Sequence, residues 1–330
     1  MAILVTGGAG YIGSHTVADL LERGEEVVVI DNLLTGHQEA LLGGKFYEGD
    51  LRDKELLTRI FAENDITAVI HFAASSLVGE SMQNPFKYYD NNVYGAMCLL
   101  DAMQQAGVKK IVFSSTAATY GEPEKVPIEE SDRTEPANVY GETKLMMERM
   151  MNWFDKVHGI RYVALRYFNA AGAHTSGKIG EDHRPESHLI PLVLQTALGQ
   201  REFISVFGED YPTEDGTCVR DYIHVSDLAD AHIKSVEYLN NEGASNVFNL
   251  GNGQGFSVKQ VIETAVKVTG RDIPVKFETR RSGDPAVLVA SSDKARSVLG
   301  WKPSYNQLED IISGAWQWHE SHPQGYGNHE

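Results

Sequence analysis

Cysteine is scarce in this chain, whose 330 residues include only Cys98 and Cys218. Two isolated cysteines without metal-ligand spacing argue against a disulfide-stabilised secreted protein and against a cysteine-based zinc site. No stretch approaches the ~18 consecutive apolar residues of a membrane-spanning helix. Residues 1–7 enter a strand-like segment without a basic leader, which is unlike a signal peptide. We therefore expect a cytoplasmic enzyme or binding protein with no membrane as partner.

Positive charge is also in short supply. The 29 lysines and arginines are outnumbered by 46 aspartates and glutamates, which gives a formal net charge of -17. Such a chain repels nucleic acids and anionic membranes, so no nucleic acid is expected as a partner. An anionic substrate would gain no long-range attraction and would have to be held by local arginines or by helix N-termini.

Glycine, by contrast, is concentrated directly after the first apolar strand, residues 2–6. The spacing of these glycines permits a tight turn, close approach of the backbone to a pyrophosphate, and a helix whose N-terminus faces the anion. The predicted dinucleotide contacts in this loop are Gly7, Gly10, Tyr11, Ile12 and Gly13.

A second apolar strand ends at Asp31 and is followed by Asn32. An acid at this position can accept hydrogen bonds from a ribose 2′-hydroxyl and would repel a 2′-phosphate, so the sequence predicts NAD and not NADP. The alternative is an ordinary turn aspartate after a strand.

Later apolar strands also end in candidate cofactor contacts. These are Asp50, Leu51, Phe72, Ala73, Ala74 and Ser114. Asn92, in a long helix predicted over residues 85–106, is either a further cofactor contact or a buried amide satisfied by the protein. Repeated strand–helix units with ligand groups at strand ends predict an α/β fold with a Rossmann-type doubly wound parallel sheet.

Tyr140 and Lys144 are four residues apart on a helix predicted to begin after Asn138, so they share one face. A phenol has a pKa near ~10, and a neighbouring positive charge lowers that pKa. Tyr140 could then accept a proton from a substrate hydroxyl. The alternative is a partly buried tyrosine beside a surface lysine.

These motifs together resemble the extended short-chain dehydrogenase/reductases. The motifs are the glycine loop, Asp31, Ser114-Ser-Thr116, Tyr140-x-x-x-Lys144 and Tyr167-Phe168-Asn169. Segments 207–217, 219–225 and 281–285 are similar to those of the UDP-hexose 4-epimerases within this family, and the resemblance runs essentially end to end. It implies bound NAD, transient oxidation of the sugar to a 4-ketone, and return of hydride to the opposite face.

The resemblance also implies roles for individual residues. Tyr140 corresponds to the base for the 4-hydroxyl, Lys144 to the group that binds the nicotinamide ribose, and Thr116 to the hydroxyl that orients the sugar. Phe168 corresponds to a residue on the cofactor side. The implied substrate contacts, for UDP-glucose or UDP-galactose, are Asn169, His188, Leu189, Ser205, Val206, Phe207, Arg220, Arg281 and Asp284.

Pocket size in this family depends on one position, which corresponds to Leu288. A residue smaller than an aromatic ring there implies that UDP-GlcNAc and UDP-GalNAc are also substrates; the alternative is a plain core leucine. The family also implies a homodimer. No metal site is predicted, because His319 and His322 lack an acidic or thiol partner and are expected in a solvated tail.

Three other functions share parts of these motifs. A 4,6-dehydratase needs an acid pair after the threonine, but Ala117 and Ala118 stand there and carry no proton. A non-catalytic NAD sensor typically lacks the Tyr or the Lys, and both are present. A 4-epimerase for UDP-glucuronate or UDP-pentoses remains open, because residues near C6 of the sugar cannot be identified.

The chain is expected to form one unit with two lobes around a cleft. Residues 1–170 are predicted to bind NAD, with segments near 220–250 returning to this lobe. Residues 171–330 are predicted to form a smaller mixed α/β lobe for the UDP-sugar.

Overall fold

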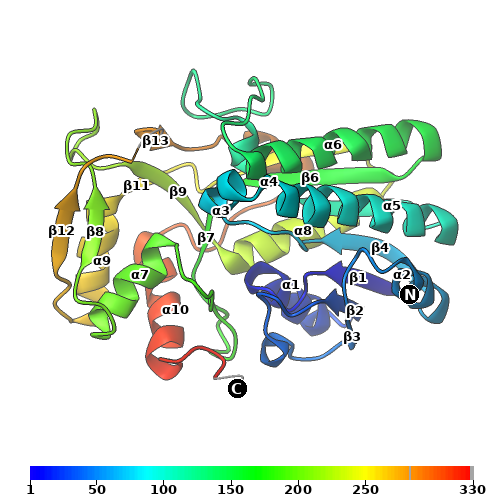
Figure 1. Cartoon of the computed structure of the whole chain (residues 1–330), viewed down its shortest axis with the longest axis horizontal. Helices are drawn as coiled ribbons and strands as arrows, with labels where there is room; N and C mark the ends of the chain where they lie inside the picture. The colour runs from blue at the N-terminus through cyan, green and yellow to red at the C-terminus, as the bar shows by residue number, and fades with distance from the viewer. Residues whose placement is uncertain (282–283, 328–330) are drawn as a thin grey trace.

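A computed structural model describes residues 1–281 and 284–327. Seven strands, parallel wherever they pair, form the main sheet in the order β10-β6-β5-β4-β1-β2-β3 (Figure 1). The strands are β1 (Ala2–Thr6), β2 (Glu26–Asp31), β3 (Lys45–Glu48), β4 (Ile66–His71), β5 (Lys110–Ser114), β6 (Arg161–Tyr167) and β10 (Asn246–Leu250). The predicted Rossmann-type doubly wound sheet is confirmed.

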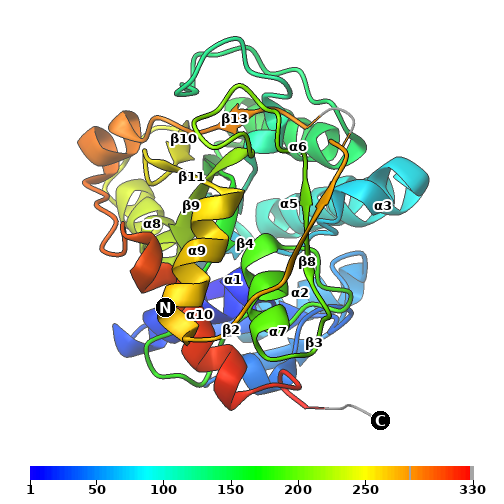
Figure 2. The same cartoon turned by 90° about the vertical axis from the view of Figure 1, so that its left-hand side faces the viewer.

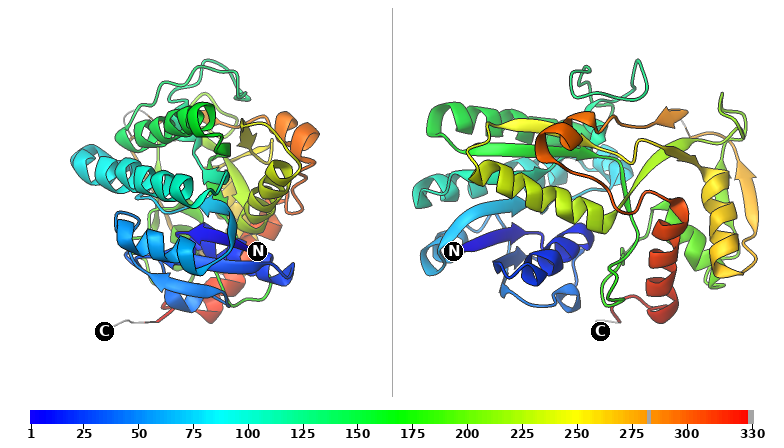
Figure 3. Two further views of the ribbon diagram at one scale, coloured as in Figure 1. Left: turned by 90° about the vertical axis from the view of Figure 1, so that its right-hand side faces the viewer. Right: turned by 180° about the vertical axis from the view of Figure 1, so that it is seen from behind.

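Alternate residues of the strands build two separate cores on the two faces of this sheet. Leu4 and Val28 face the core covered by α2 (Lys54–Glu63), α5 (Gly95–Ala106) and α6 (Val139–His158). The strand residues that point to the other side of the sheet face α1 (Tyr11–Glu22) and α8 (Val225–Asn240). Figure 3 shows these two helices side by side. Because both faces are covered, the inner strands β1, β4 and β5 are buried along almost their whole length instead of alternating.

The switch point of the sheet lies between β1 and β4. From β1 the chain continues outward to β2 and β3, whereas β4 starts the other half. The helices that follow β1 and β4 cover opposite faces of the sheet, and ligands of open α/β sheets bind at such a switch point. As predicted, β10 returns to the main sheet, where it pairs with β6.

The helix predicted over residues 85–106 is continuous, but it contains a wide turn that the sequence did not indicate. It consists of α4 (Pro85–Tyr88), a π-helical segment η2 (Tyr89–Tyr94) and α5, preceded by α3 (Val78–Gln83). The wide π turn carries Asn92 inward, where its amide is fully buried. Such wide turns are frequent at functional sites because they reorient a side chain without ending the helix.

The smaller lobe packs three helices and short sheets around a third core (Figure 2). Its elements are β7 (Asn169–Ala171), α7 (Leu189–Ala197), β8 (Ile204–Phe207), β9 (Val219–His224), β11 (Gly255–Ser257), α9 (Val258–Thr269), β12 (Val275–Glu278), β13 (Val287–Leu288) and α10 (Leu308–Ser321). Ser257 caps α9 in a capping box with Gln260, as a serine before an apolar run predicts. Three further short segments are η1 (Gln38–Ala40), η3 (Ala117–Thr119) and η4 (Ala295–Leu299).

The C-terminal helix α10 corrects one expectation. His319 is buried within it and His322 stacks on Trp318 with ring centroids 3.8 Å apart, so these histidines do not form a solvated tail. Trp318 is itself fully buried. Across residues 1–281 and 284–327, none of the helices is both long and apolar enough for a membrane crossing.

Candidate active site

The glycine loop lies directly on the carboxyl end of β4. Gly7 has a positive φ of 70°, and a Cβ there would stand 2.6 Å from the backbone nitrogen of Ala73. A Cβ on Gly13 would stand 2.1 Å from the carbonyl oxygen of Gly7. Both positions require glycine, because any side chain would displace the backbone.

The N-terminus of α1 has the properties of an anion site. Gly10 is its N-cap and supplies no side-chain cap, and the first turn, Tyr11 to Gly13, contains no acid. The first N–H groups of a helix lack intrahelical partners and carry partial positive charge. A pyrophosphate would satisfy them, so this loop fits the predicted dinucleotide.

Asp31 lies beside the same loop at the end of β2. Its carboxylate accepts hydrogen bonds from the backbone N–H groups of Ala9 (3.0 Å) and Leu33 (2.9 Å). Burial raises the pKa of Asp31, and these hydrogen bonds oppose that rise. Asn32 donates to Asp50, which is paired with Arg52. The two predicted acids therefore flank one loop region, with the buried Leu51 following Asp50.

Asn92 is satisfied by protein groups. Its Oδ1 accepts from the backbone N–H of Ser75 (2.8 Å), and its Nδ2 donates to the Ser75 carbonyl (3.0 Å) and to Thr143 (3.2 Å). This favours the buried amide over the direct cofactor contact. Asn92 ties the loop after Phe72, Ala73 and Ala74 to helix α6, so its place is structural support of that loop.

Tyr140 stands in the first turn of α6, whose N-cap is Asn138, as predicted. The Asn138 side chain accepts from the backbone N–H of Gly141 at 2.8 Å. Ser81, fully buried on α3, accepts the backbone N–H of Tyr140 at 3.2 Å. The phenol lies close enough to the Thr116 hydroxyl for that hydroxyl to lower its pKa. The structure thus brings the two predicted hydroxyls together.

Lys144 is buried one turn further along α6. Its Nζ donates to the carbonyl of Ser114 (2.8 Å) and lies 5.8 Å from the centre of the Tyr140 ring. Burial lowers the pKa of Lys144 to about 7, although Glu148 opposes the change. The alternative of a surface lysine is excluded for this chain, because only 2% of Lys144 is exposed.

The expected lowering of the Tyr140 pKa is not found. Burial raises the pKa of Tyr140 to about 12, and the nearby Thr116 hydroxyl acts in the opposite direction. Loss of hydration disfavours the phenolate. Lys144 directs its ammonium to a carbonyl instead of to the phenol. That prediction is wrong for this structure, and further positive charge is needed to produce a phenolate.

A buried ion pair supports this arrangement. Glu148, on α6, pairs with Arg166 of β6 at 2.5 Å and also accepts from Ser115 at 2.5 Å. Ser114, the neighbour of Ser115, shares a 2.5 Å hydrogen bond with Tyr167. Glu148 lies one turn beyond Lys144, and its contacts with Arg166 and Ser115 hold α6 against the carboxyl ends of β6 and β5.

The predicted diphosphate arginines are each occupied by a protein partner. Arg220 pairs with Asp284, the predicted ribose contact. The guanidinium of Arg281 lies over the ring of Phe207, 3.9 Å from its centre. Residues 282 and 283, which complete the Arg281–Asp284 motif, lie outside the described residues. Ser205 and Val206 precede Phe207 on β8.

The other predicted substrate residues lie on nearby elements. Asn169 donates to the backbone carbonyl of Asp221 at 3.1 Å. Leu288 of β13 packs with Phe168 on a small cluster that includes Ala117, the neighbour of Thr116. This places Leu288 next to the catalytic candidates instead of in a remote core.

His188 is the N-cap of α7, directly before Leu189. Burial would lower the pKa of His188, but the charges of Glu181 and Glu186 outweigh burial and raise it to about 10. The Nδ1 atom of this ring therefore contacts Glu181 and Glu186 within the protein, and only its Nε2 atom is left for a ligand.

Several supporting residues were not found from the sequence. Ser81, Glu148 and Arg166 depend on contacts between distant elements, and no local pattern marks them. Glu181 and Glu186 stand in a segment rich in histidine and acid, and that composition was the available signal.

The doubly wound sheet, the glycine loop and the Tyr–Lys pair define an NAD-dependent enzyme of the short-chain dehydrogenase type. A model of the NAD dependent epimerase/dehydratase family matches residues 3–251. The chain belongs to this family, and within it to the UDP-glucose 4-epimerases. Its activity is inversion at C4 of UDP-hexoses, and its cofactor is NAD.

Two similar relatives are the UDP-glucose 4-epimerases of Halalkalibacterium halodurans and Streptococcus mutans. The first is 62% identical over 99% of this chain and 98% of its own, and the second is 58% identical over 100% of both. A solved UDP-glucose 4-epimerase from Brucella ovis in complex with NAD is 47% identical, with a TM-score of 0.94 over 96% of this chain and 97% of that one. One from Bifidobacterium longum in complex with NAD+ and UDP is 40% identical, with a TM-score of 0.93 over 99% and 100%.

Replacement of Gly13 by alanine should lower NAD occupancy, because the new Cβ would stand 2.1 Å from the Gly7 carbonyl and distort the loop. The measurement is the NAD released per chain on denaturation. Gly79→Ala is the matched control, since a Cβ there meets nothing within 4 Å. Full NAD content in Gly13→Ala would contradict the assignment of this loop.

Proposed function

We propose that Tyr140 transfers the proton of the sugar 4-hydroxyl while the configuration at C4 of UDP-galactose or UDP-glucose is inverted. The observation that carries this proposal is the buried Lys144, whose Nζ lies 5.8 Å from the centre of the Tyr140 ring, with the Thr116 hydroxyl near the phenol. Few other arrangements would place a proton acceptor, a hydroxyl-orienting group and a cation together at the carboxyl edge of a dinucleotide-binding sheet.

When bound, NAD would supply the hydride acceptor and donor for C4, and its oxidised nicotinamide ring would supply positive charge. The residues that fit it are those of the glycine loop, Asp31 and Lys144. Positive charge favours the phenolate of Tyr140, whose pKa is otherwise about 12. The phenolate accepts the proton of the 4-hydroxyl as the C4–H bond breaks. The same proton returns to the oxygen when the C–H bond forms again.

Lys144 changes charge close to neutrality. A lysine whose pKa is lowered to about 7 is mostly protonated below that pH and mostly neutral above it. A phenolate on Tyr140 would favour the protonated lysine, because opposite charges stabilise each other. Thr116 then orients the sugar oxygen through its hydroxyl. Ala117 and Ala118 offer no acid, so the ketone has no route to loss of water.

We also propose that the UDP moiety holds the sugar while its ring turns over. Arg220 and Arg281 provide forked donors for the diphosphate, and Asp284 provides an acceptor for the uridine ribose. The remaining contacts are proposed from His188, Leu189, Asn169 and residues 205–207. Residues 1–170, with α8 and β10, form the NAD lobe in this proposal, and the other residues from 171 on form the substrate lobe.

Tyr140→Phe should lower kcat by about 10²–10⁴-fold, because the proton acceptor is lost while the ring remains. UDP-galactose should still bind, as measured by calorimetry. Tyr89→Phe, which alters an exposed phenol of η2, is the control and should leave kcat unchanged. Near-normal turnover by Tyr140→Phe would exclude the phenol from proton transfer.

We propose that UDP-GlcNAc and UDP-GalNAc are substrates as well. Leu288 packs near Ala117 and leaves more room than an aromatic residue. A solved UDP-Glc/GlcNAc 4-epimerase from Campylobacter jejuni is 43% identical to this chain, with a TM-score of 0.86 over 97% of this chain and 99% of that one. This similarity supports a sugar pocket that is wide enough for an N-acetyl group.

Leu288→Tyr should reduce kcat/KM for UDP-GlcNAc on the order of 10–100-fold, because the ring occupies the space of the acetamido group. The rate for UDP-galactose should change little. Leu288→Met conserves volume and serves as the control. Wild-type protein without turnover of UDP-GlcNAc would refute the proposal.

We propose that the protein is a homodimer formed through α3, α4, η2, α5 and α6. Exposed apolar side chains gather on these elements. They are Val78, Met82, Phe86, Tyr89, Tyr94, Met97, Trp153 and Val157. Of these, Phe86 is 79% exposed and Trp153 is 63% exposed. Apolar surface of this extent commonly marks an interface.

Light scattering should give twice the mass of one chain. The double variant Phe86→Ser with Trp153→Ser should shift the mass toward the monomer as the protein is diluted. Val298→Ser, on η4, removes an exposed apolar residue elsewhere and should leave the dimer intact. A monomeric wild type would contradict the proposal.

A further inference from the structure

Four metal-ligating side chains meet in the long connection between β7 and α7. They are Glu181, His183, Glu186 and His188. Their ligand atoms all lie within 4.8 Å of one another, although the connection has no regular secondary structure. The catalytic proposal uses His188 only through its predicted contact with UDP, and it leaves the other three without a role.

The histidine–glutamate distances within this cluster are compatible with four ligands around one ion. The Nδ1 atom of His183 lies 3.2 Å from Glu181 and 3.7 Å from Glu186. The Nδ1 atom of His188 lies 2.7 Å from Glu181 and 3.2 Å from Glu186. Four ligands at the Zn–N and Zn–O distance of about 2.0 Å would be separated from one another by about 3.3 Å. The four histidine–glutamate separations, 2.7 to 3.7 Å, lie on both sides of this value, and those to Glu186 involve both of its carboxylate oxygens.

Burial adds an electrostatic requirement. The side chains of Glu181 and Glu186 are 4% and 6% exposed, respectively. Two carboxylates that approach the same point in a poorly hydrated region need compensating positive charge. Protonated His183 and His188 provide this charge in the metal-free chain, because both glutamates raise the pKa of each ring. A divalent cation that displaces those two protons would provide the same charge.

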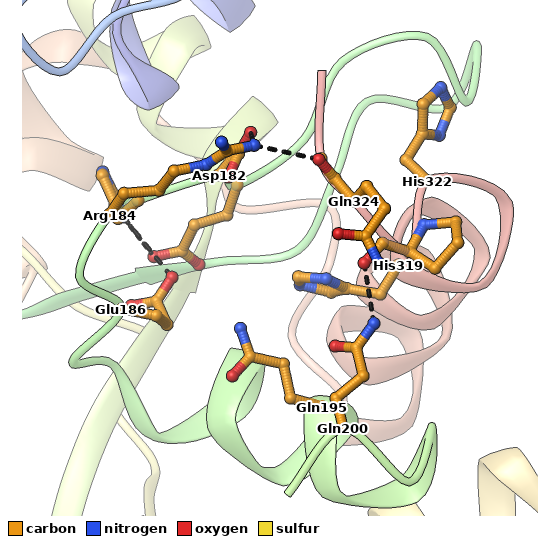
Figure 4. A pocket seen from close by; sticks show the side chains of 12 residues that line it. Asp182, Arg184, Glu186, Gln195, Gln200, His319, His322 and Gln324 are labelled. Carbon is orange, nitrogen blue, oxygen red and sulfur yellow. Dashed lines mark hydrogen bonds and ion pairs between the residues drawn. The ribbon is translucent and has the colours of Figure 1, made fainter. Parts of the chain in front are cut away.

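A pocket of about 340 Å³ opens onto this cluster (Figure 4). Figure 4 shows Glu186 on one wall and His319 on the opposite wall, with Gln195 and Gln200 of the α7 region below. The pocket gives an ion a route to the buried carboxylates. The three members of the cluster that line it are Glu181, His183 and Glu186.

We propose that Glu181, His183, Glu186 and His188 form a structural Zn²⁺ site. Two imidazoles with two carboxylates suit zinc, whereas Mg²⁺ and Ca²⁺ prefer oxygen ligands throughout. Four protein ligands close the coordination shell, which is typical of structural and not of catalytic zinc. The Nε2 atom of His188 remains outside the shell, so its predicted contact with UDP is compatible with the metal.

The position of the site suggests what the ion does. The ring of His183 packs edge-on against Tyr11 of the glycine-loop helix, with centroids 6.1 Å apart. The backbone carbonyl of Glu181 accepts from Trp318 of α10. A metal there joins the start of α7 to this connection and holds it against both the NAD lobe and the C-terminal helix.

The test uses full-length protein without a histidine tag, treated with a chelator and then titrated with Zn²⁺ or Co²⁺. We expect one Zn²⁺ per chain by elemental analysis after gel filtration, and a Co²⁺ complex with the intense visible absorption of four-coordinate cobalt. The melting temperature should rise with Zn²⁺, because the ion binds the folded chain. Absence of stoichiometric zinc would overturn the proposal.

Variants identify the ligands. His183→Asn and Glu186→Gln should each weaken Zn²⁺ binding on the order of 100-fold or more, since even changes outside the ligand shell cost 10–100-fold. Circular dichroism and NAD content establish that each variant is folded. His174→Asn is the matched control, because His174 belongs to a separate cluster with Asp19 and Glu22. If His174→Asn loses the zinc, or if both cluster variants bind it like the wild type, the assignment is wrong.

Discussion

The hydrogen bond from the buried ammonium of Lys144 to the Ser114 carbonyl joins helix α6 to the carboxyl end of β5. This bond satisfies a charge that burial would otherwise make costly. It also determines the rotation of α6, because a lysine held at this carbonyl places the residue one turn earlier on the same face. Tyr140 consequently stands beside Thr116, which follows β5 by two residues.

The cost of this arrangement is visible in the pKa values. Burial lowers the pKa of Lys144 to about 7 and raises that of Tyr140 to about 12, so both groups favour their neutral forms. A protonated phenol has no free site for the proton of an alcohol. Burial alone therefore disfavours the basic form of Tyr140. Arrival of positive charge beside the phenol would activate it, which couples the chemistry to bound cofactor.

Much of this site could be predicted from local sequence. The strand pattern, the glycine loop, Asp31 and the Asn138 cap depend on residues close together in the chain, and each was found where expected. The position of Asn92 on an inward π turn could not be predicted, because the turn depends on partners at Ser75 and Thr143. Glu148 and Arg166 are 18 residues apart and become a pair only when α6 packs on β6.

The pairing of charges around the predicted UDP site could not be predicted from local sequence either. Arg220 and Asp284 were assigned to different parts of the ligand, yet they form an ion pair in the structure. A carboxylate has four lone-pair sites and a guanidinium has five N–H donors, so neither is exhausted by the other. A ribose hydroxyl can donate to Asp284 while Arg220 turns its remaining donors to a phosphate. In a chain of net charge -17, this pairing also keeps the acid from repelling the diphosphate. The ion pair is thus compatible with both assignments, and it keeps the arginine positioned before an anion enters.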